Sequence, residues 1–306
     1  MNYLKDHSVL LGTIKNYVSI ITFSFGFVGN LLAFLVFSCK KFQNTIFSTY
    51  FRCLCLFDFL YLIIAFLQIL SFDIKIVHLF SVSNFSCKIL SYFSYFIAAI
   101  SAWTMVIISL DRMFSIVWPS RFLFRKKSIN QIVIIVGMFI FNTIYWSPVL
   151  FLADLKYIQN ETNQTGRLKC IAVSSLLSCF ELINISVVPF SLMIISTILT
   201  LIKIFKSRKR QSSSVKSKDI KFAITSISLN IIFLVLNLPV TMLVLFTNSV
   251  EELDRLLLSV LSLMFQCNYS LVFYVNLIVN SLFRKEFYKL IKQIKISIQY
   301  FLSNYF

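Results

Sequence analysis

The sequence predicts an all-α membrane protein: a bundle of seven transmembrane helices followed by a short amphipathic eighth helix. Of its 306 residues 58% are apolar and only 13% are charged, whereas about 25% of a soluble domain is charged. A soluble protein this apolar could not cover its surface with polar groups, so a lipid bilayer is its natural solvent. We expect an extracellular N-terminus at residues 1–16, the seven-helix bundle at 17–282, and helix eight with a short cytoplasmic tail at 283–306.

Seven apolar segments reach the length of about 20 residues that a membrane-spanning helix needs. Lipid offers no partners for backbone polar groups, and the segments lack the alternating pattern of a barrel, so each is expected to be a helix. The segments are Tyr17–Cys39, Ile46–Leu70, Cys87–Val117, Ile129–Leu152, Ala172–Phe205, Ile220–Phe246 and Leu256–Leu282.

Basic residues are distributed unequally between the two sides of these segments. Nineteen lysines and arginines lie in the gaps or at the segment ends on one side, and seven lie on the side that carries the N-terminus. Because basic residues favour the cytoplasmic face, this asymmetry predicts an extracellular N-terminus and a cytosolic C-terminus. The net charge of +17 is then an orientation signal and a surface for the anionic lipid bilayer, and we expect no nucleic-acid partner.

The third segment carries a cysteine and an acid–arginine pair near its two ends. Cys87 lies 25 residues before Arg112, a separation of about 37 Å along a helix. The hydrocarbon core of a bilayer is about 30 Å thick. One helix would therefore place Cys87 at one membrane face and Asp111-Arg112 at the other. Taken alone, the Asp-Arg pair could be merely the first polar pair after a span.

In this arrangement and in the order of its other motifs, the chain resembles the rhodopsin-family (class A) G-protein-coupled receptors from about Gly29 to Phe287. The motifs are Cys87, Ser109-Leu110-Asp111-Arg112-Met113, Pro189, Pro239 and Phe283-Arg284. The resemblance implies a receptor in the plasma membrane and not an enzyme. Its expected partners are an extracellular ligand and a heterotrimeric G protein.

The resemblance also implies a disulfide on the outer side. Cys87 and Cys170 would both face the oxidising exterior, where disulfides persist. The other cysteines lie in or beside spans, so we expect the bridge Cys87–Cys170, which matches the family's. Three glycosylation sequons fall on the same side, at Asn84, Asn160 and Asn163.

For the inner side, the resemblance implies a set of residues for G-protein coupling. Arg112 would pair at rest with Asp111 and with Asp219 at the inner end of helix six. Phe233 stands where the family keeps a phenylalanine that moves on activation, and Pro239 would be the hinge.

The chain departs from the family in helices six and seven. Asn237 replaces the usual tryptophan before Pro239, and the N-P-x-x-Y motif falls on Val272–Asn276, where its asparagine, proline and tyrosine are all replaced. One alternative is therefore a divergent receptor that binds ligand with weak or no G-protein coupling. Another is a seven-span transporter or channel, which would require charges along a path through the spans, where only Asp58 and Glu181 qualify.

Polar residues within the apolar spans suggest a buried core. Asp58 would be costly in mid-membrane and is a functional candidate for that reason. By resemblance, Asp58 and Ser101 would bind an allosteric sodium ion, with Asn30 and Asn268 beside them. The alternative is a polar cluster that only packs helices together. We expect no other cofactor and no other metal.

The ligand is constrained by two positions. Ser94 stands where a monoamine receptor carries an aspartate, and Gln266 stands where an opsin carries its lysine. A peptide or another small polar agonist remains, and the L-N-L-P and F-R-K-E-F stretches resemble invertebrate neuropeptide receptors of the FMRFamide type. We expect Glu181, Ser94, Tyr95 and Gln266 to contact the ligand.

Glu181 is the charged member of this set. It lies eight residues before Pro189, about 2.2 turns outward in a regular helix. The other spans offer no lysine or arginine at that depth, so a cationic group of the ligand would supply the missing charge. Alternatively, Glu181 bonds Lys88 or water at the rim, or stays protonated.

Overall fold

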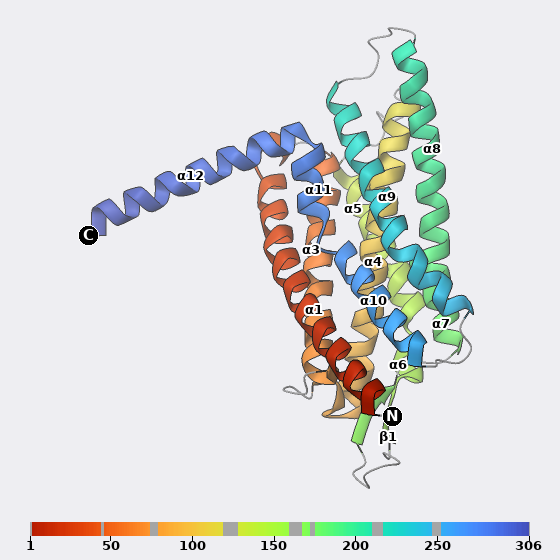
Figure 1. Ribbon diagram of the computed structural model, residues 1–306. Helices are drawn as coiled ribbons and strands as arrows, with labels where there is room; N and C mark the ends of the chain where they lie inside the picture. The colour runs from red at the N-terminus through yellow and green to blue at the C-terminus, as the bar shows by residue number, and fades with distance from the viewer. Residues whose placement is uncertain are drawn as a thin grey trace.

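The computed structural model describes residues 2–43, 46–73, 79–118, 128–158, 167–171, 175–209, 217–246 and 252–305, and these residues are mostly helical (Figure 1). The α-helices are α1 (Asn2–Phe37), α2 (Lys40–Gln43), α3 (Ile46–Gln68), α4 (Asn84–Val117), α5 (Ser128–Trp146), α6 (Val149–Leu152), α7 (Ser175–Glu181), α8 (Val188–Lys209), α9 (Ser217–Phe246), α10 (Glu252–Asn268), α11 (Val272–Val279) and α12 (Ser281–Tyr305). Shorter elements are the π-helices η1 (Ile69–Asp73) and η4 (Leu182–Val187), the 3₁₀-helix η2 (Leu79–Ser81), and strands β1 (Asp154–Ile158) and β2 (Arg167–Ile171).

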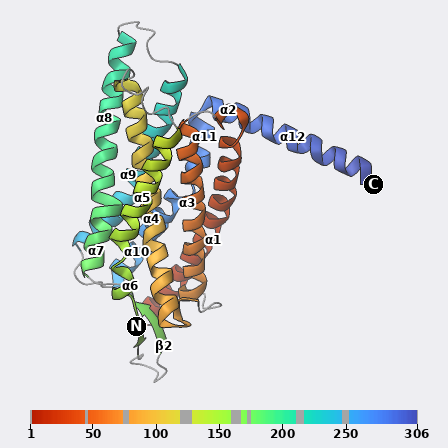
Figure 2. The same cartoon turned by 180° about the vertical axis from the view of Figure 1, so that it is seen from behind.

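The predicted seven-helix membrane bundle is confirmed. Within the described ranges, six helical stretches are long and apolar enough to cross a bilayer, and the bent pair α10–α11 makes a seventh. The stretch within α4 is the central one, since 67% of its most apolar window is buried inside the protein, against 22% for the stretch that begins in α5. In both views α4 lies between α1 and α3 on one side and α8 on the other (Figures 1 and 2).

The outer surface of the bundle is apolar. Large hydrophobic side chains on α1, α5 and α8 are exposed, among them Phe25, Val28, Ile132, Ile140 and Ile195. Water does not favour so large an apolar surface, whereas lipid tails do. The bundle therefore faces lipid on its sides and buries its polar side chains inside.

The fifth segment corrects the expectation of a regular helix outward of Pro189. The structure divides it into α7, the π-helix η4 and α8, and the backbone N–H of Val188 donates to the carbonyl of Ile183, five residues back. π-Helices are rare and appear mostly as single-turn bulges at functional sites. Two hydrogen bonds accompany this π-helix. The Trp103 indole N–H donates to Asn184 Oδ1 at 2.6 Å in a partly buried contact, and Asn184 Nδ2 donates to Asn142 Oδ1 at 3.1 Å in a buried one.

The seventh segment is also not one continuous helix. Its two parts, α10 and α11, are bent by 59° across a short break, although no proline is present. The side chain of Asn30 donates to the backbone oxygen of Tyr269 at 2.8 Å, which satisfies a carbonyl at the break. Gly26 permits the close approach, because a Cβ there would lie 2.6 Å from Ser270 Cβ. Asn30 and Gly26 therefore do at this bend part of what a proline does elsewhere.

The two ends of the chain leave the bundle in different ways. Helix α1 begins at Asn2, and its candidate span starts at Thr13. The predicted eighth helix is α12, which runs away from the bundle as far as Tyr305 (Figure 1). The antiparallel pair β1–β2 lies at the opposite end, close to the N-terminus.

Candidate functional site

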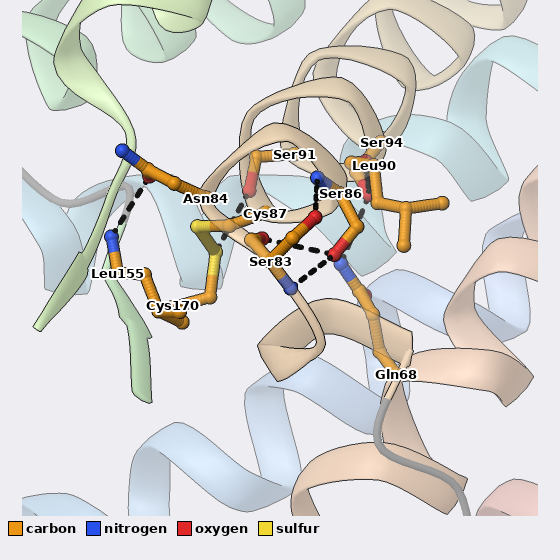
Figure 3. The surroundings of a disulfide bond; sticks show 10 residues. All are labelled: Gln68, Ser83, Asn84, Ser86, Cys87, Leu90, Ser91, Ser94, Leu155 and Cys170. Atoms are coloured by element: carbon orange, nitrogen blue, oxygen red, sulfur yellow. Dashed lines mark hydrogen bonds between the residues drawn. A yellow bond between two sulfur atoms is a disulfide. The ribbon is translucent and has the colours of Figure 1, made fainter. Parts of the chain in front are cut away.

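A disulfide fixes the β-hairpin to the end of α4, as predicted. Cys87 and Cys170 are bonded, with their Cα atoms 5.5 Å apart and the Cys87 side chain fully buried. The Ser91 hydroxyl lies 3.5 Å from the Cys170 sulfur, one turn further along α4 (Figure 3). The bridge therefore holds β2 beside the first two turns of the central helix.

The start of α4 is held by its own side chains. Ser83 and Ser86 form a reciprocal capping box, which satisfies two backbone N–H groups at the helix end. The exposed Asn84 accepts a hydrogen bond from the Leu155 backbone N–H at 3.2 Å (Figure 3). Of the three sequons, Asn160 and Asn163 lie outside the described residues.

A cavity of about 250 Å³ opens beneath this hairpin. Three of the four predicted ligand contacts, Ser94, Tyr95 and Glu181, line it. Gln266 does not, and its backbone oxygen instead accepts from the Tyr269 N–H. The remaining lining residues are Tyr61, Gln68, Phe80, Ser91, Ala98, Cys170, Ile185 and Phe265. Because Cys170 is among them, the disulfide contributes directly to the wall.

One wall of the cavity is a hydrogen-bonded chain between two helices. Gln68 Nε2 of α3 donates to Ser94 Oγ at 3.0 Å, and Ser94 Oγ donates to the Leu90 carbonyl at 2.8 Å (Figure 3). This contact joins α3 to α4 and orients both polar side chains. The polar groups of this wall are therefore fixed before any ligand arrives.

Glu181 is the charged group of the cavity. Among the described residues it makes no hydrogen bond and no ion pair, and Lys88 does not reach it. The hydroxyls of Tyr61 and Tyr95 lie within electrostatic range of its carboxylate. A carboxylate in a half-buried, low-dielectric site favours a cation as partner. The cavity is therefore suited to a positively charged group, which aromatic rings and hydroxyl groups of its walls would surround.

A polar cluster lies deeper, below the cavity. The Ser101 hydroxyl donates to the carboxylate of Asp58, whose side chain is 2% exposed. The rings of Tyr61 and Tyr269 stack with centroids 3.7 Å apart, and the Tyr269 hydroxyl lies within electrostatic range of both Asp58 and Glu181. That hydroxyl is buried and has no hydrogen-bond partner in the described part of the chain.

The predicted sodium site is only partly assembled. Asp58 and Ser101 are in contact, but Asn268 makes no hydrogen bond to either of them, and Asn30 is engaged with the Tyr269 carbonyl. Hard cations are held by several oxygen ligands at once. Of the predicted residues, the described contacts bring together only Asp58 and Ser101, and no step below depends on the ion.

At the end of α4 opposite the hairpin, Arg112 is paired as predicted with its neighbour. Arg112 Nη2 lies 2.5 Å from Asp111 Oδ2, and both side chains are less than 10% exposed. The guanidinium also lies 4.7 Å from the ring centroid of Phe47, a cation–π contact with α3. The side chain of Asp219, the other predicted partner, lies outside the described residues.

A second contact in the half of the bundle that holds Arg112 joins three helices. The Ser109 hydroxyl of α4 donates to Asn230 Oδ1 of α9 at 2.8 Å, and Asn230 Nδ2 donates to Thr197 Oγ1 of α8 at 2.9 Å. One turn outward, Phe233 packs edge-on against Phe190, with ring centroids 5.4 Å apart. These contacts hold α9 against the bundle on the N-terminal side of its proline.

Helix α9 contains Pro239, as predicted, with a polar side chain beside it. Asn237 Nδ2 donates to the Phe233 backbone oxygen at 2.7 Å, and the Asn237 side chain is buried. A proline inside a helix removes one backbone hydrogen bond and favours a bend. Asn237 thus adds a side-chain hydrogen bond to the same part of the helix.

Several of these residues were not singled out from the sequence. They are Tyr61, Gln68, Trp103, Asn142, Asn184, Thr197, Asn230 and Tyr269. The amides could have been found, because an asparagine in an apolar span tends to face protein, the rule that identified Asn30. The two tyrosines carried no such signal.

Comparison with protein families identifies the family to which this arrangement belongs. A family model described as "7 transmembrane receptor (rhodopsin family)" matches residues 29–281, which is most of the chain. A comparison with curated proteins found no match. The matched range includes the disulfide, the outer cavity, the Asp58–Ser101 pair and the Asp111–Arg112 pair. The chain therefore belongs to the rhodopsin family of seven-transmembrane receptors.

Proposed function

We propose that this receptor binds an extracellular ligand through a cationic group and in response promotes nucleotide exchange on a heterotrimeric G protein. The observation that carries the proposal is Glu181, a carboxylate without a partner among the described residues, in a cavity lined by tyrosine hydroxyls. A ligand amine or guanidinium would form charge-assisted hydrogen bonds there.

The size of the cavity favours a peptide. At about 250 Å³ it is smaller than the 300–1,000 Å³ typical of pockets that enclose a whole small molecule. A cavity of this size suits one side chain of a larger ligand, while the rest contacts the hairpin and the helix ends. An arginine-bearing neuropeptide of the FMRFamide type fits both the charge and the size.

The same proposal places the hairpin end outside the cell. The disulfide Cys87–Cys170 and the sequon at Asn84 lie at this end, and both belong to the oxidising exterior. Lysines concentrate at the other end, in α2 and α12, as expected for the cytoplasmic face. We also propose N-linked glycans at Asn84, Asn160 and Asn163.

Activation would be a shift between two packings of α9. At rest, Asn230 ties α9 to α4 and α8, and Arg112 is held by Asp111 and, we propose, by Asp219. A ligand that favours the other packing would swing the inner part of α9 outward about Pro239 and open a cleft for the G protein. The ligand can do so only by binding that packing more tightly than it binds the resting packing.

A divergent receptor with weak coupling is the second candidate. Asn237 is bonded to its own helix, and Val272–Asn276 lack the family's N-P-x-x-Y residues. In this case ligand would bind at the cavity without strong nucleotide exchange.

One experiment separates the two candidates. Cells expressing the chain are screened with amidated peptides, with calcium and cAMP as readouts, alongside the variant Arg112→Ala. The proposal expects a peptide response that Arg112→Ala abolishes while surface expression and peptide binding remain. Peptide binding without any signal in the unmodified receptor would establish the weakly coupled alternative. A signal that survives Arg112→Ala would contradict the proposed role of Arg112.

A further inference from the structure

Another cavity lies at the other end of the molecule, where α1, α2 and α12 meet. It measures about 820 Å³, and its walls include Lys40 and Lys41 from α2 and Glu286, Lys289 and Gln293 from α12. Figure 2 shows α2 beside the start of α12. This cavity takes no part in the activities proposed above.

The cavity carries a positive charge that its own walls do not neutralise. Lys41 Nζ pairs with Glu286 Oε1 at 2.9 Å. Lys40 and Lys289 make no ion pair or hydrogen bond with any described residue. Three lysines and one glutamate therefore leave a net of two positive charges facing one space. The neighbouring Cys39 thiol also lies within the electrostatic influence of Lys289. Burial and then Glu286 raise the pKa of Cys39, and Lys289 offsets part of this rise.

The neighbours of the cavity indicate that this space adjoins lipid. The outward face of α1 exposes Phe34 and Leu35 just before α2, and a receptor of this family presents such a face to the bilayer. Helix α12 extends sideways from the bundle, with Ile291 and Ile294 exposed among its lysines (Figure 1). An amphipathic helix of this kind lies at the membrane surface with its apolar side in the lipid.

We infer that this cavity binds the phosphorylated headgroup of an anionic lipid. A headgroup that bears phosphate monoesters would place its phosphates against Lys40 and Lys289, while its acyl chains follow the exposed face of α1. Basic pockets between helices on the cytoplasmic side suit such headgroups, and under the proposed orientation the cavity lies on that side. The alternative source of the same chemistry is a soluble phosphate compound, which lacks the contact with α1.

The test uses the full-length receptor in phosphatidylcholine nanodiscs that contain a small fraction of fluorescent phosphatidylinositol bisphosphate. Energy transfer from a dye on the receptor reports lipid binding. The double substitution Lys40→Gln with Lys289→Gln should weaken binding about tenfold or more. The matched control, Lys292→Gln with Lys295→Gln, removes the same charge from exposed positions of α12 that do not line the cavity and should change binding little.

Two further measurements distinguish lipid binding from misfolding of the variants and from binding of soluble phosphate compounds. Glu286→Gln frees Lys41 and removes the only carboxylate in the described walls, so binding should become tighter, a result that misfolding does not produce. Inositol trisphosphate, which carries the phosphates without acyl chains, should compete poorly. Equal losses in the two lysine double variants would overturn the inference in favour of general attraction to anionic membranes. Competition by inositol trisphosphate as strong as by the lipid would overturn the lipid as occupant.

Discussion

Tyr61 of α3 and Tyr269 at the break in helix seven stack with ring centroids 3.7 Å apart and planes 24° from parallel. Tyr61 lines the outer cavity, whereas Tyr269 lies within electrostatic range of Asp58 in the polar core. The pair therefore connects the proposed ligand site with the centre of the bundle. A ligand that displaces the Tyr61 ring would act directly on the bend between α10 and α11.

The Tyr269 hydroxyl should contribute no stabilising hydrogen bond. Because it is buried and unpartnered within the described residues, it carries a desolvation cost of about 1–3 kcal/mol. Tyr269→Phe keeps the stacked ring and should leave the melting temperature in detergent unchanged or raise it. Tyr269→Ala removes the ring and should cost about 3–5 kcal/mol. Tyr288→Phe, at an exposed position on α12, is the control. A clear loss of stability in Tyr269→Phe would reveal a partner for the hydroxyl.

Removal of the Glu181 charge should weaken agonist action. Glu181→Gln keeps the shape of the side chain, and the loss of a charge-assisted contact with a cationic ligand should reduce potency at least tenfold, or about 1.4 kcal/mol. Potency is measured from calcium or cAMP dose–response curves at matched surface expression. Equal potency of Glu181→Gln and the unmodified receptor would assign Glu181 a structural role.

Loss of the Asn230 contacts should release α9. Asn230→Ala removes two hydrogen bonds between three helices, each worth about 0.5–1.5 kcal/mol. Since these bonds belong to the resting packing, ligand-independent signalling should rise several-fold. Ser228→Ala on the same helix removes a hydroxyl that bonds only its own backbone, at Ile224, and serves as control. Basal signalling that stays level in Asn230→Ala would show that the contact exists in both packings.

Asp219 should restrain the resting state through Arg112. An ion pair at the edge of the protein is worth about 1 kcal/mol, and more if it is desolvated. Asp219→Ala should therefore raise basal signalling several-fold, whereas Asp219→Glu, which keeps the charge, should raise it less. Basal G-protein activation is measured in membranes with equal receptor content. If both variants behave like the unmodified receptor, Asp219 does not restrain Arg112.

The disulfide should be needed for a stable outer end. It closes a separation of 83 residues, and loss of a native disulfide typically costs about 2–5 kcal/mol. Cys170→Ser should lower surface expression and the melting temperature, whereas Cys179→Ser, which removes an exposed free thiol, should not. Peptide mapping with and without reductant tests the bond itself. Free thiols at Cys87 and Cys170 in surface-expressed protein would contradict it.

The sequence predicted best what depends on fixed offsets within and between apolar segments. The Cys87–Cys170 bridge was expected from the shared side of the two cysteines and from the family resemblance. The Asp58–Ser101 contact was expected from the resemblance, with Ser101 located by its offset from Arg112. Glu181 was expected outward of Pro189 on a regular helix, and it lines the cavity although a π-helix separates the two residues. The bend in helix seven was not, because it depends on Gly26 and Asn30 of a distant helix. The tyrosine stack was missed since no spacing rule relates two aromatic residues so far apart in the chain.

The π-helix before Pro189 has a consequence for comparisons between receptors. A π-turn holds more residues than an α-turn, and each residue of an α-helix advances the chain by about 100°. Positions outward of η4 are therefore rotated relative to those in a receptor whose fifth helix is regular. An alignment without a gap would pair Glu181 with a residue on a different side of the helix. To transfer the ligand selectivity of this chain to another receptor, the extra residue of the π-helix would have to be transferred together with Glu181.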